Sequence, residues 1–167
     1  MTQKEIEQTV GTISAQIGKL APDFTLTTHT GEQVTLSHFR QHKNVILYFY
    51  PKDNTPSCTT EACTFRDNYQ LFTREETEVI GISSDSPLSH QKFSRRHQLP
   101  FTLLTDPHGT IRKRYQITAT FGLIPGRVTY LIDKQGIIRH IFSDQFHAQR
   151  HITEALNALK SLQQTVE

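Results

Sequence analysis

The chain of 167 residues holds only two cysteines, Cys58 and Cys63, and they stand five positions apart. They lie in the segment PKDNTPSCTTEAC (51–63), directly after the apolar run VILYFY. A close pair of cysteines fits several kinds of chemistry: packing as small apolar side chains, metal coordination, a structural disulfide or redox catalysis. The residues around the two cysteines distinguish among these alternatives.

The position of Cys58 favours a reactive thiol. The sequence predicts that Cys58 lies in the first turn of a helix, where unpaired backbone N–H groups and the helix dipole stabilise an anion. The alternative is a small side chain packed in the core, which is common for a lone cysteine. The residues around it carry hydroxyl groups: Thr55, Ser57, Thr59 and Thr60. They offer hydrogen bonds rather than apolar contacts, which weakens the packing alternative.

The histidines and the cysteine spacing argue against a metal site. Zinc sites usually have two to four residues between paired ligands and a second ligand pair elsewhere. Of the nine histidines, His147 and His151 stand four apart, but the sequence places them on the last helix, where we interpret them as solvent-facing. We therefore expect no metal and no other cofactor.

The same spacing argues against a static disulfide. Five residues along a helix place two Cα atoms roughly 8–9 Å apart, whereas a disulfide needs them within about 7 Å. A cross-link between Cys58 and Cys63 therefore requires the helix to unwind. A dithiol enzyme of the CxxC type is excluded because the chain lacks that motif. A thiol peroxidase needs a thiolate, hydrogen-bond donors for the peroxide, a cation and a second thiol that resolves the sulfenic acid.

The length, composition and net charge of the chain are typical of one globular domain. The net charge of +2 and the lack of a basic run give no reason to expect a nucleic-acid partner. The longest apolar run is far shorter than the ~20 residues of a membrane span, so we expect no membrane association. The polar N-terminus lacks the apolar core of a signal peptide, so the sequence predicts a cytoplasmic protein unless an upstream targeting segment has been removed.

Strands and helices alternate along the chain, which predicts a mixed sheet with helices on both faces. A β-hairpin is predicted at 22–39 around Thr30-Gly31, after a first segment, 1–17, that is either a short amphipathic helix or partly disordered. Further strands are predicted at 44–50, 78–85, 101–106, 127–133 and 137–142. Helices are predicted at 56–76, 87–98, 108–117 and 148–163. Both cysteines then lie where the strand at 44–50 passes into a helix.

These motifs together resemble a known family. The pattern PxxxTxxC formed by Pro51, Thr55 and Cys58 resembles the active-site segment of the peroxiredoxins. Cys63 and the stretches FTLLTD and FGLIPGRVTYLIDKQG narrow the resemblance to the bacterioferritin-comigratory-protein/PrxQ branch, over about residues 17–162. The resemblance implies a thioredoxin-like fold at 18–167, with 1–17 as an N-terminal extension. It also implies reduction of hydrogen peroxide and organic hydroperoxides, with thioredoxin as the reductant and a monomeric state.

The resemblance also assigns roles to five residues. Cys58 becomes the peroxidatic thiolate and Cys63 the resolving cysteine, which forms an intrachain disulfide with it. Thr55 would hydrogen-bond the thiolate and the peroxide, Arg127 would supply the cation, and Pro51 would shape and shield the pocket.

One departure from the family pattern is Ser57, which replaces a usual glycine and would be strained if a positive φ were required there.

The alternative function is a redox sensor or chaperone that uses the same two cysteines without turnover. A thioredoxin-like scaffold with inert cysteines is the least demanding alternative.

Overall fold

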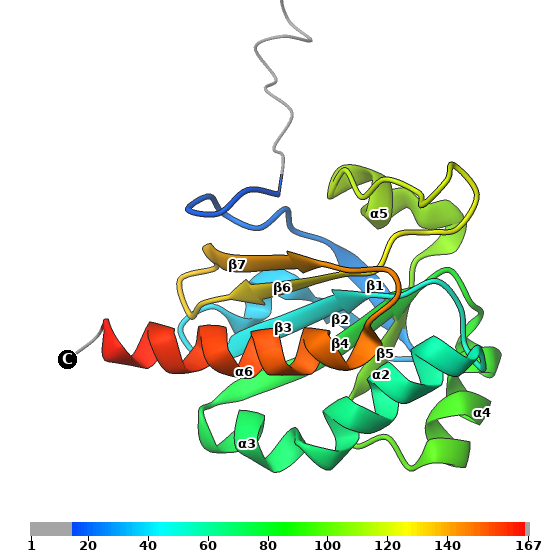
Figure 1. Ribbon diagram of the computed structural model, residues 1–167, viewed down its shortest axis with the longest axis horizontal. Coiled ribbons are helices and arrows are strands. Elements are labelled where there is room, and N and C mark those ends of the chain that lie inside the picture. Colours follow the sequence, from blue (N-terminus) through cyan, green and yellow to red (C-terminus); the bar gives the residue numbers. More distant parts are fainter. Residues whose placement is uncertain (1–14, 166–167) are drawn as a thin grey trace, which may run out of the picture.

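A seven-stranded mixed sheet forms the centre of the protein, with the strand order β2-β1-β5-β4-β3-β6-β7 (Figure 1). The computed structural model describes residues 15–165, so most of the segment 1–17 lies outside the described residues. The strands are β1 (Thr25–Thr28), β2 (Gln33–Thr35), β3 (Asn44–Phe49), β4 (Thr77–Ser83), β5 (Thr102–Thr105), β6 (Val128–Ile132) and β7 (Ile138–Ser143). The parallel pairs are β3 with β4 and β4 with β5, and the other pairs are antiparallel. The expected thioredoxin-like α/β fold and every predicted strand are confirmed.

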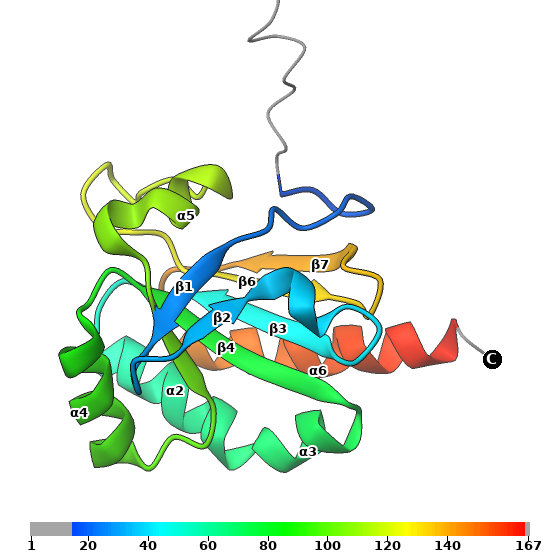
Figure 2. The same ribbon diagram turned by 180° about the vertical axis from the view of Figure 1, so that it is seen from behind.

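The longer helices cover one face of this sheet, as Figures 1 and 2 show from opposite sides. The helical elements are η1 (Leu36–Phe39), α2 (Pro56–Asp67), α3 (Tyr69–Arg74), α4 (Pro87–His97), η2 (Pro107–Gly109), α5 (Thr110–Arg114) and α6 (Ala148–Gln164). Side chains of α2, α3, α4 and α6 share one apolar cluster, whereas η1 and α5 contribute to the cluster on the other face. In the described part of the chain, no helix combines the length and the apolar character that crossing a membrane requires.

The predicted helix at 56–76 is wrong in one respect, because it is two helices that meet at Asn68. Asn68 has φ −107° and ψ 6°, outside the helical region. Its side-chain amide donates a hydrogen bond of 2.8 Å to the carbonyl oxygen of Thr64. A short polar side chain that bonds the local backbone in this way competes with the regular helix. The chain therefore turns before α3, and α2 is a separate helix of twelve residues.

The central strand β3 is buried on both faces. Ile46 and Tyr48 belong to the cluster under α2 and α6, whereas Val45, Leu47 and Phe49 belong to the opposite cluster. Such two-sided burial is typical of a central strand covered on both faces and explains its continuous apolar run. Strand β3 ends at Phe49, and the chain then runs directly into the segment that precedes Cys58.

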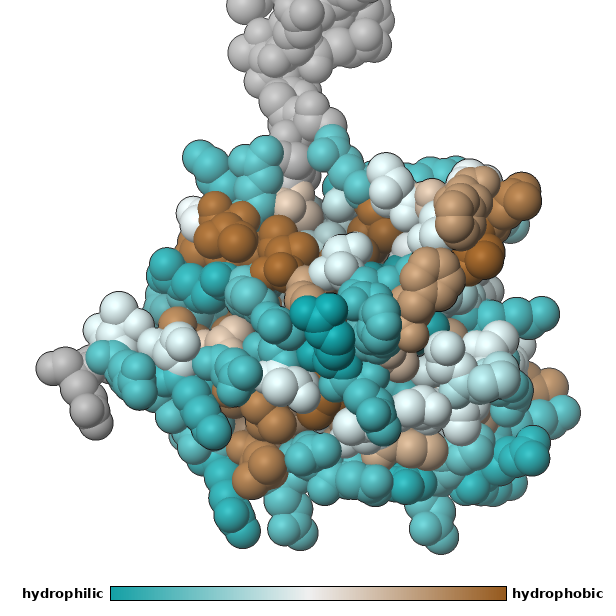
Figure 3. Space-filling view, in the orientation of Figure 1, coloured by the Kyte–Doolittle hydropathy of each residue, from teal (hydrophilic) through white to brown (hydrophobic). Residues whose placement is uncertain are grey.

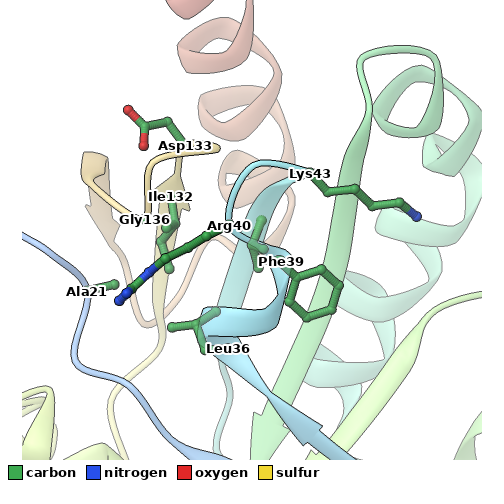
Figure 4. A pocket seen from close by; sticks show the side chains of 9 residues that line it. Ala21, Leu36, Phe39, Arg40, Lys43, Ile132, Asp133 and Gly136 are labelled. Carbon is green, nitrogen blue, oxygen red and sulfur yellow. The ribbon is translucent and has the colours of Figure 1, made fainter.

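A small pocket lies on the opposite face of the sheet. Its volume is about 10 Å³, room for about one water molecule. Arg40 extends its guanidinium group toward Ala21 in this pocket (Figure 4). Gly136, in the turn between β6 and β7, has φ +82°, and a Cβ there would lie 2.6 Å from the Arg40 Nε. Glycine is therefore required both by the predicted hairpin turn and by the close approach of Arg40.

Candidate active site

Cys58 lies in the first turn of α2, and its side chain is buried at 1% exposure. Thr55 precedes the helix in an extended conformation and Pro56 is the first helical residue, a position that suits proline because its missing N–H has no partner there anyway. The Thr55 hydroxyl donates to the carbonyl oxygen of Lys52 at 2.9 Å rather than to the thiol. Ser57 does not adopt a positive φ, so the serine that replaces the family glycine is not strained.

Arg127 brings a cation to the thiol from the opposite side. It stands directly before β6 and is 3% exposed. Its Nη2 donates to the Cys58 Sγ at 3.3 Å, and its Nη1 donates to Glu61 Oε1 at 2.7 Å. Its Nε also donates to the backbone carbonyl of Gln145 at 3.3 Å. Burial lowers the pKa of Arg127, but Glu61 and Cys58 outweigh this effect, so that the pKa lies above its ordinary value.

A second buried arginine, Arg112, fixes the backbone around this contact. Its Nη2 donates to the carbonyl oxygen of Tyr50 at 2.9 Å, and its Nη1 donates to the carbonyl oxygen of Gly126. Arg112 therefore connects the end of β3 with the residue before Arg127. Sequence reasoning had no ground to single out Arg112 within its predicted helix, because a basic helical residue is usually exposed.

Glu61 and His151 complete the buried polar cluster, and sequence reasoning missed both. Glu61 is 0% exposed, and burial raises its pKa to about 8 against the opposing effect of Arg127. His151 is also 0% exposed, so its prediction as solvent-facing is wrong, whereas the neighbouring His147 is exposed. The His151 ring lies between the Thr129 hydroxyl, at 2.8 Å, and the Asp144 carbonyl, at 2.7 Å.

Cys63 lies further along α2 with a half-buried side chain, and both cysteines are free thiols. The helix is regular through both positions, so the sequence-based distance argument applies to the structure. Arg66, one turn later, donates to the backbone carbonyl of His97 at 2.7 Å and so holds the far end of α2 against α4. Pro51 is half-buried at the end of β3. A Cys58–Cys63 bond therefore requires unwinding of the part of α2 that lies before this anchor.

A second buried network holds the segment between β3 and α2. Asp53 accepts hydrogen bonds from the Tyr50 hydroxyl at 2.6 Å and the Ser89 hydroxyl at 2.9 Å, and it lies 2.8 Å from His90 Nδ1. The Asp53 backbone N–H donates to Asp85 at 2.9 Å. The His90 contacts help lower the pKa of Asp53 below its usual range, although burial acts in the opposite direction. The segment that leads to Cys58 is thus fixed to α4 by several hydrogen bonds.

Comparisons with known proteins identify the family. The model of the AhpC/TSA family matches residues 17–141. The chain is 46% identical over 154 residues to the chloroplastic peroxiredoxin Q of Populus jackii, covering 90% of this chain and 72% of that protein. It is 47% identical over 146 residues to the chloroplastic peroxiredoxin Q of Oryza sativa subsp. japonica, covering 87% of this chain and 67% of that protein.

Solved structures agree with the sequence matches. The peroxidoxin BcpB of Mycobacterium tuberculosis superposes with a TM-score of 0.81 at 31% identity, covering 88% of this chain and 97% of that one. A mutant of PrxQ from Xylella fastidiosa gives the same TM-score at 29% identity, covering 89% and 97%.

The names of the plant relatives correct one expectation and support another. Since they are called chloroplastic, they point to a plastid, and the predicted cytoplasmic location is wrong. The expected activity agrees with the names and the fold, and it implies peroxide substrates and a thiol reductant. The buried thiol with its arginine and the agreement of both comparisons lead to one assignment: the chain belongs to the AhpC/TSA family, in its peroxiredoxin Q branch, and is a thiol-dependent peroxidase.

Proposed function

We propose that Cys58 is the residue that attacks the peroxide. The observation that supports this most strongly is the hydrogen bond from Arg127 Nη2 to the Cys58 Sγ at the N-terminal end of α2. Arginine and the helix N-terminus both stabilise the thiolate and the charge that develops on the peroxide oxygens. The thiolate attacks one oxygen, the O–O bond breaks, and the other oxygen leaves as an alkoxide or hydroxide that takes up a proton. Pro51 shields the resulting sulfenic acid, and Thr55 contributes its hydroxyl once the substrate displaces the bond to Lys52.

Cys63 then resolves the sulfenic acid. Its thiolate attacks the Cys58 sulfur, hydroxide leaves and takes up a proton as water, and an intrachain disulfide forms. The free thiols and regular helix of the present structure match the reduced state. The first turns of α2 unwind for the bond to form, while Arg66 keeps the end of the helix in place. A dithiol protein of the thioredoxin kind reduces the disulfide, and the enzyme acts as a monomer.

We propose a plastid as the compartment of this protein. Their chloroplastic names support a plastid environment, where a dithiol reductant would meet the enzyme. Fractionation of the source cells, with detection of the protein in the plastid fraction, tests this part of the proposal.

The test of the assignments is hydrogen peroxide consumption coupled to thioredoxin and its reductase. Cys58→Ser is expected to abolish turnover. Cys63→Ser is expected to consume one equivalent and then stop, because the sulfenic acid has no intramolecular partner. Glu32→Gln, an exposed change in the turn between β1 and β2, is the matched control and keeps full turnover. Normal turnover of Cys63→Ser with thioredoxin would refute the resolving role. A wild type that stops after one equivalent would favour the sensor function.

Amide hydrogen exchange tests the unwinding step separately. Residues 57–64 are expected to lose protection in the disulfide form relative to the reduced form, because their helical hydrogen bonds open. Equal protection of this segment in both forms would mean that the disulfide forms without unwinding, in conflict with the helix geometry.

A further inference from the structure

One buried cation, Arg127, faces two acidic groups at once. Its two terminal nitrogens donate separately, one to the Cys58 sulfur and the other to Glu61 Oε1. The side chain of Arg127 is 2% exposed and that of Glu61 is 0% exposed. Two ionised acids on a single cation would leave an uncompensated negative charge in a buried site, which is costly. The arrangement therefore favours a state in which only one of the two acids is ionised.

The second oxygen of Glu61 indicates that the carboxyl group is the one that keeps its proton. No residue in the range 15–165 donates a hydrogen bond to Glu61 Oε2. The group that it faces is Nδ1 of His151, at 3.7 Å. The other ring nitrogen, Nε2, lies 2.7 Å from the Asp144 carbonyl oxygen, which can only accept, so Nε2 carries the hydrogen. Nδ1 is then a bare acceptor, which takes the hydroxyl hydrogen of Thr129.

A carboxylate oxygen at this place would meet only a nitrogen lone pair. Protonation removes the negative charge that faces this lone pair, so the neutral carboxyl group is the form that fits this place. The approach of Glu61 to His151 is therefore not an ion pair, because burial lowers the His151 pKa to about 4 and leaves the ring neutral near neutral pH.

The remaining groups around Glu61 do not change this balance. Tyr48 reaches the same region from β3, and its buried hydroxyl finds no hydrogen-bond partner among the described residues. Burial raises the Tyr48 pKa well above its ordinary value, so the phenol is neutral. The charge balance around Glu61 therefore depends on Arg127 and Cys58. Burial also raises the pKa of Glu61 to about 8, in agreement with the geometric argument.

We propose that Glu61 holds a proton while Cys58 is a thiolate and gives it up when Cys58 becomes a sulfenic acid. This inference rests on the proposed role of Cys58. The thiolate and the hydroperoxide become a sulfenic acid and an alkoxide, and the alkoxide takes up one proton. Glu61 loses one proton in the same step. The reactants are therefore a thiolate, a carboxylic acid and a hydroperoxide, and the products are a sulfenic acid, a carboxylate and an alcohol. Arg127 thus faces one anion before and after the reaction, and Glu61 is a positioning residue that acts through Arg127.

Infrared difference spectroscopy of the Cys63→Ser protein tests this exchange, because that variant stops at the sulfenic acid. Addition of one equivalent of hydrogen peroxide is expected to remove a protonated-carboxyl C=O band and to produce a carboxylate band. Both bands are expected to be missing in Cys63→Ser/Glu61→Gln and retained in Cys63→Ser/Glu32→Gln, since Glu32 is exposed. Mass spectrometry of the same samples records whether the sulfenic acid has formed.

Proton uptake is the second measurement, in weak buffer at neutral pH with a pH indicator. Starting from the thiolate, Cys63→Ser is expected to take up no net proton per sulfenic acid, whereas Cys63→Ser/Glu61→Gln takes up about one. A sulfenic acid that forms without any carboxyl band change in Cys63→Ser refutes the Glu61 inference while the peroxidase assignment stands. Failure of Cys58 to form a sulfenic acid at all refutes the proposed role of Cys58 instead. If the glutamine variant does not fold, the infrared result on Cys63→Ser alone decides the inference.

Discussion

Replacement of Glu61 by glutamine is expected to change how the stability of the reduced protein depends on pH. Glutamine keeps the shape of the side chain and an oxygen that accepts from Arg127 Nη1, but it cannot ionise. Burial raises the pKa of Glu61 from 4.5 to about 8 in the folded protein. Between these two values the folded state binds one proton more than the unfolded state. The free energy of unfolding of the wild type therefore falls as the pH rises through this window.

The size of this effect follows from the difference between the two pKa values. Each pH unit corresponds to about 1.4 kcal/mol, and the values differ by roughly 3.5, which gives a loss on the order of 5 kcal/mol across the window. The variant lacks this loss, so its stability relative to the wild type is expected to rise by that amount between pH 4.5 and 8. His151 acts in the opposite direction, since burial lowers its pKa to about 4 and stability rises with pH between 4 and 6.5. This contribution is present in both proteins and cancels in the difference.

Urea denaturation of both reduced proteins at several pH values measures the difference. A comparison in the Cys58→Ser background provides the internal control. Without the thiol, Arg127 has only Glu61 as an anionic partner, so the pKa of Glu61 falls and the pH-dependent difference becomes smaller. Parallel stability curves of the wild type and Glu61→Gln from pH 4.5 to 8 would refute the reasoning, because they would mean that Glu61 ionises as easily in the folded state as in the unfolded state.

Three further predictions concern the core, the cation and the second polar network. Phe65→Ala is expected to lower the free energy of unfolding by about 3–5 kcal/mol, because Phe65 is fully buried and its ring stacks on that of Tyr48, with 4.6 Å between the ring centroids. A loss below about 1 kcal/mol in urea denaturation would contradict this packing. Arg127→Lys is expected to slow the reaction of the reduced enzyme with hydrogen peroxide at least about 100-fold in stopped-flow measurements, because lysine cannot donate from two fixed nitrogens to the thiol and the carboxyl group. Asp53, Asp85 and His90 lie close enough together to suggest a metal site. Hydrogen bonds within the protein already occupy this cluster, however. We therefore expect EDTA to leave the melting temperature unchanged and a titration with Zn²⁺ to show no binding at this cluster.

The strands and most helices were predictable because their signals are local. The continuous apolar run of β3 and the Pro-initiated α4 both follow from residues next to each other in sequence. The break at Asn68 was missed because helix periodicity continues across it through Phe65 and Phe72, and only the hydrogen bonds of Asn68 interrupt the helix.

The polar members of the site were harder to predict, because their burial depends on contacts between distant elements. His151 is buried by Thr129 and Asp144, which the sequence does not place beside it. Glu61 did carry a local signal. It stands three residues after Cys58 and four before Phe65, so it lies on the buried face of α2 rather than among the surface residues of that helix. A charged residue within a buried helical stripe near a candidate thiol indicates a buried charge pair, although the sequence analysis assigned Arg127 to the thiol and named no partner for Glu61.

The position of Glu61 between Cys58 and Cys63 connects the charge balance of the site with the unwinding of α2. The buried side chains of α2 are Cys58, Glu61, Ala62 and Phe65. Unwinding as far as Cys63 exposes only the first three of these, of which Ala62 loses little apolar contact and Glu61 gains water. Once Cys58 is a sulfenic acid, Glu61 is the single anionic partner of Arg127, so unwinding has to break this buried ion pair. The same residue that balances the charge of Arg127 thus opposes the opening of the helix by its ion pair, whereas Phe65 and the hydrogen bond of Arg66 limit the opening to the first part of the helix.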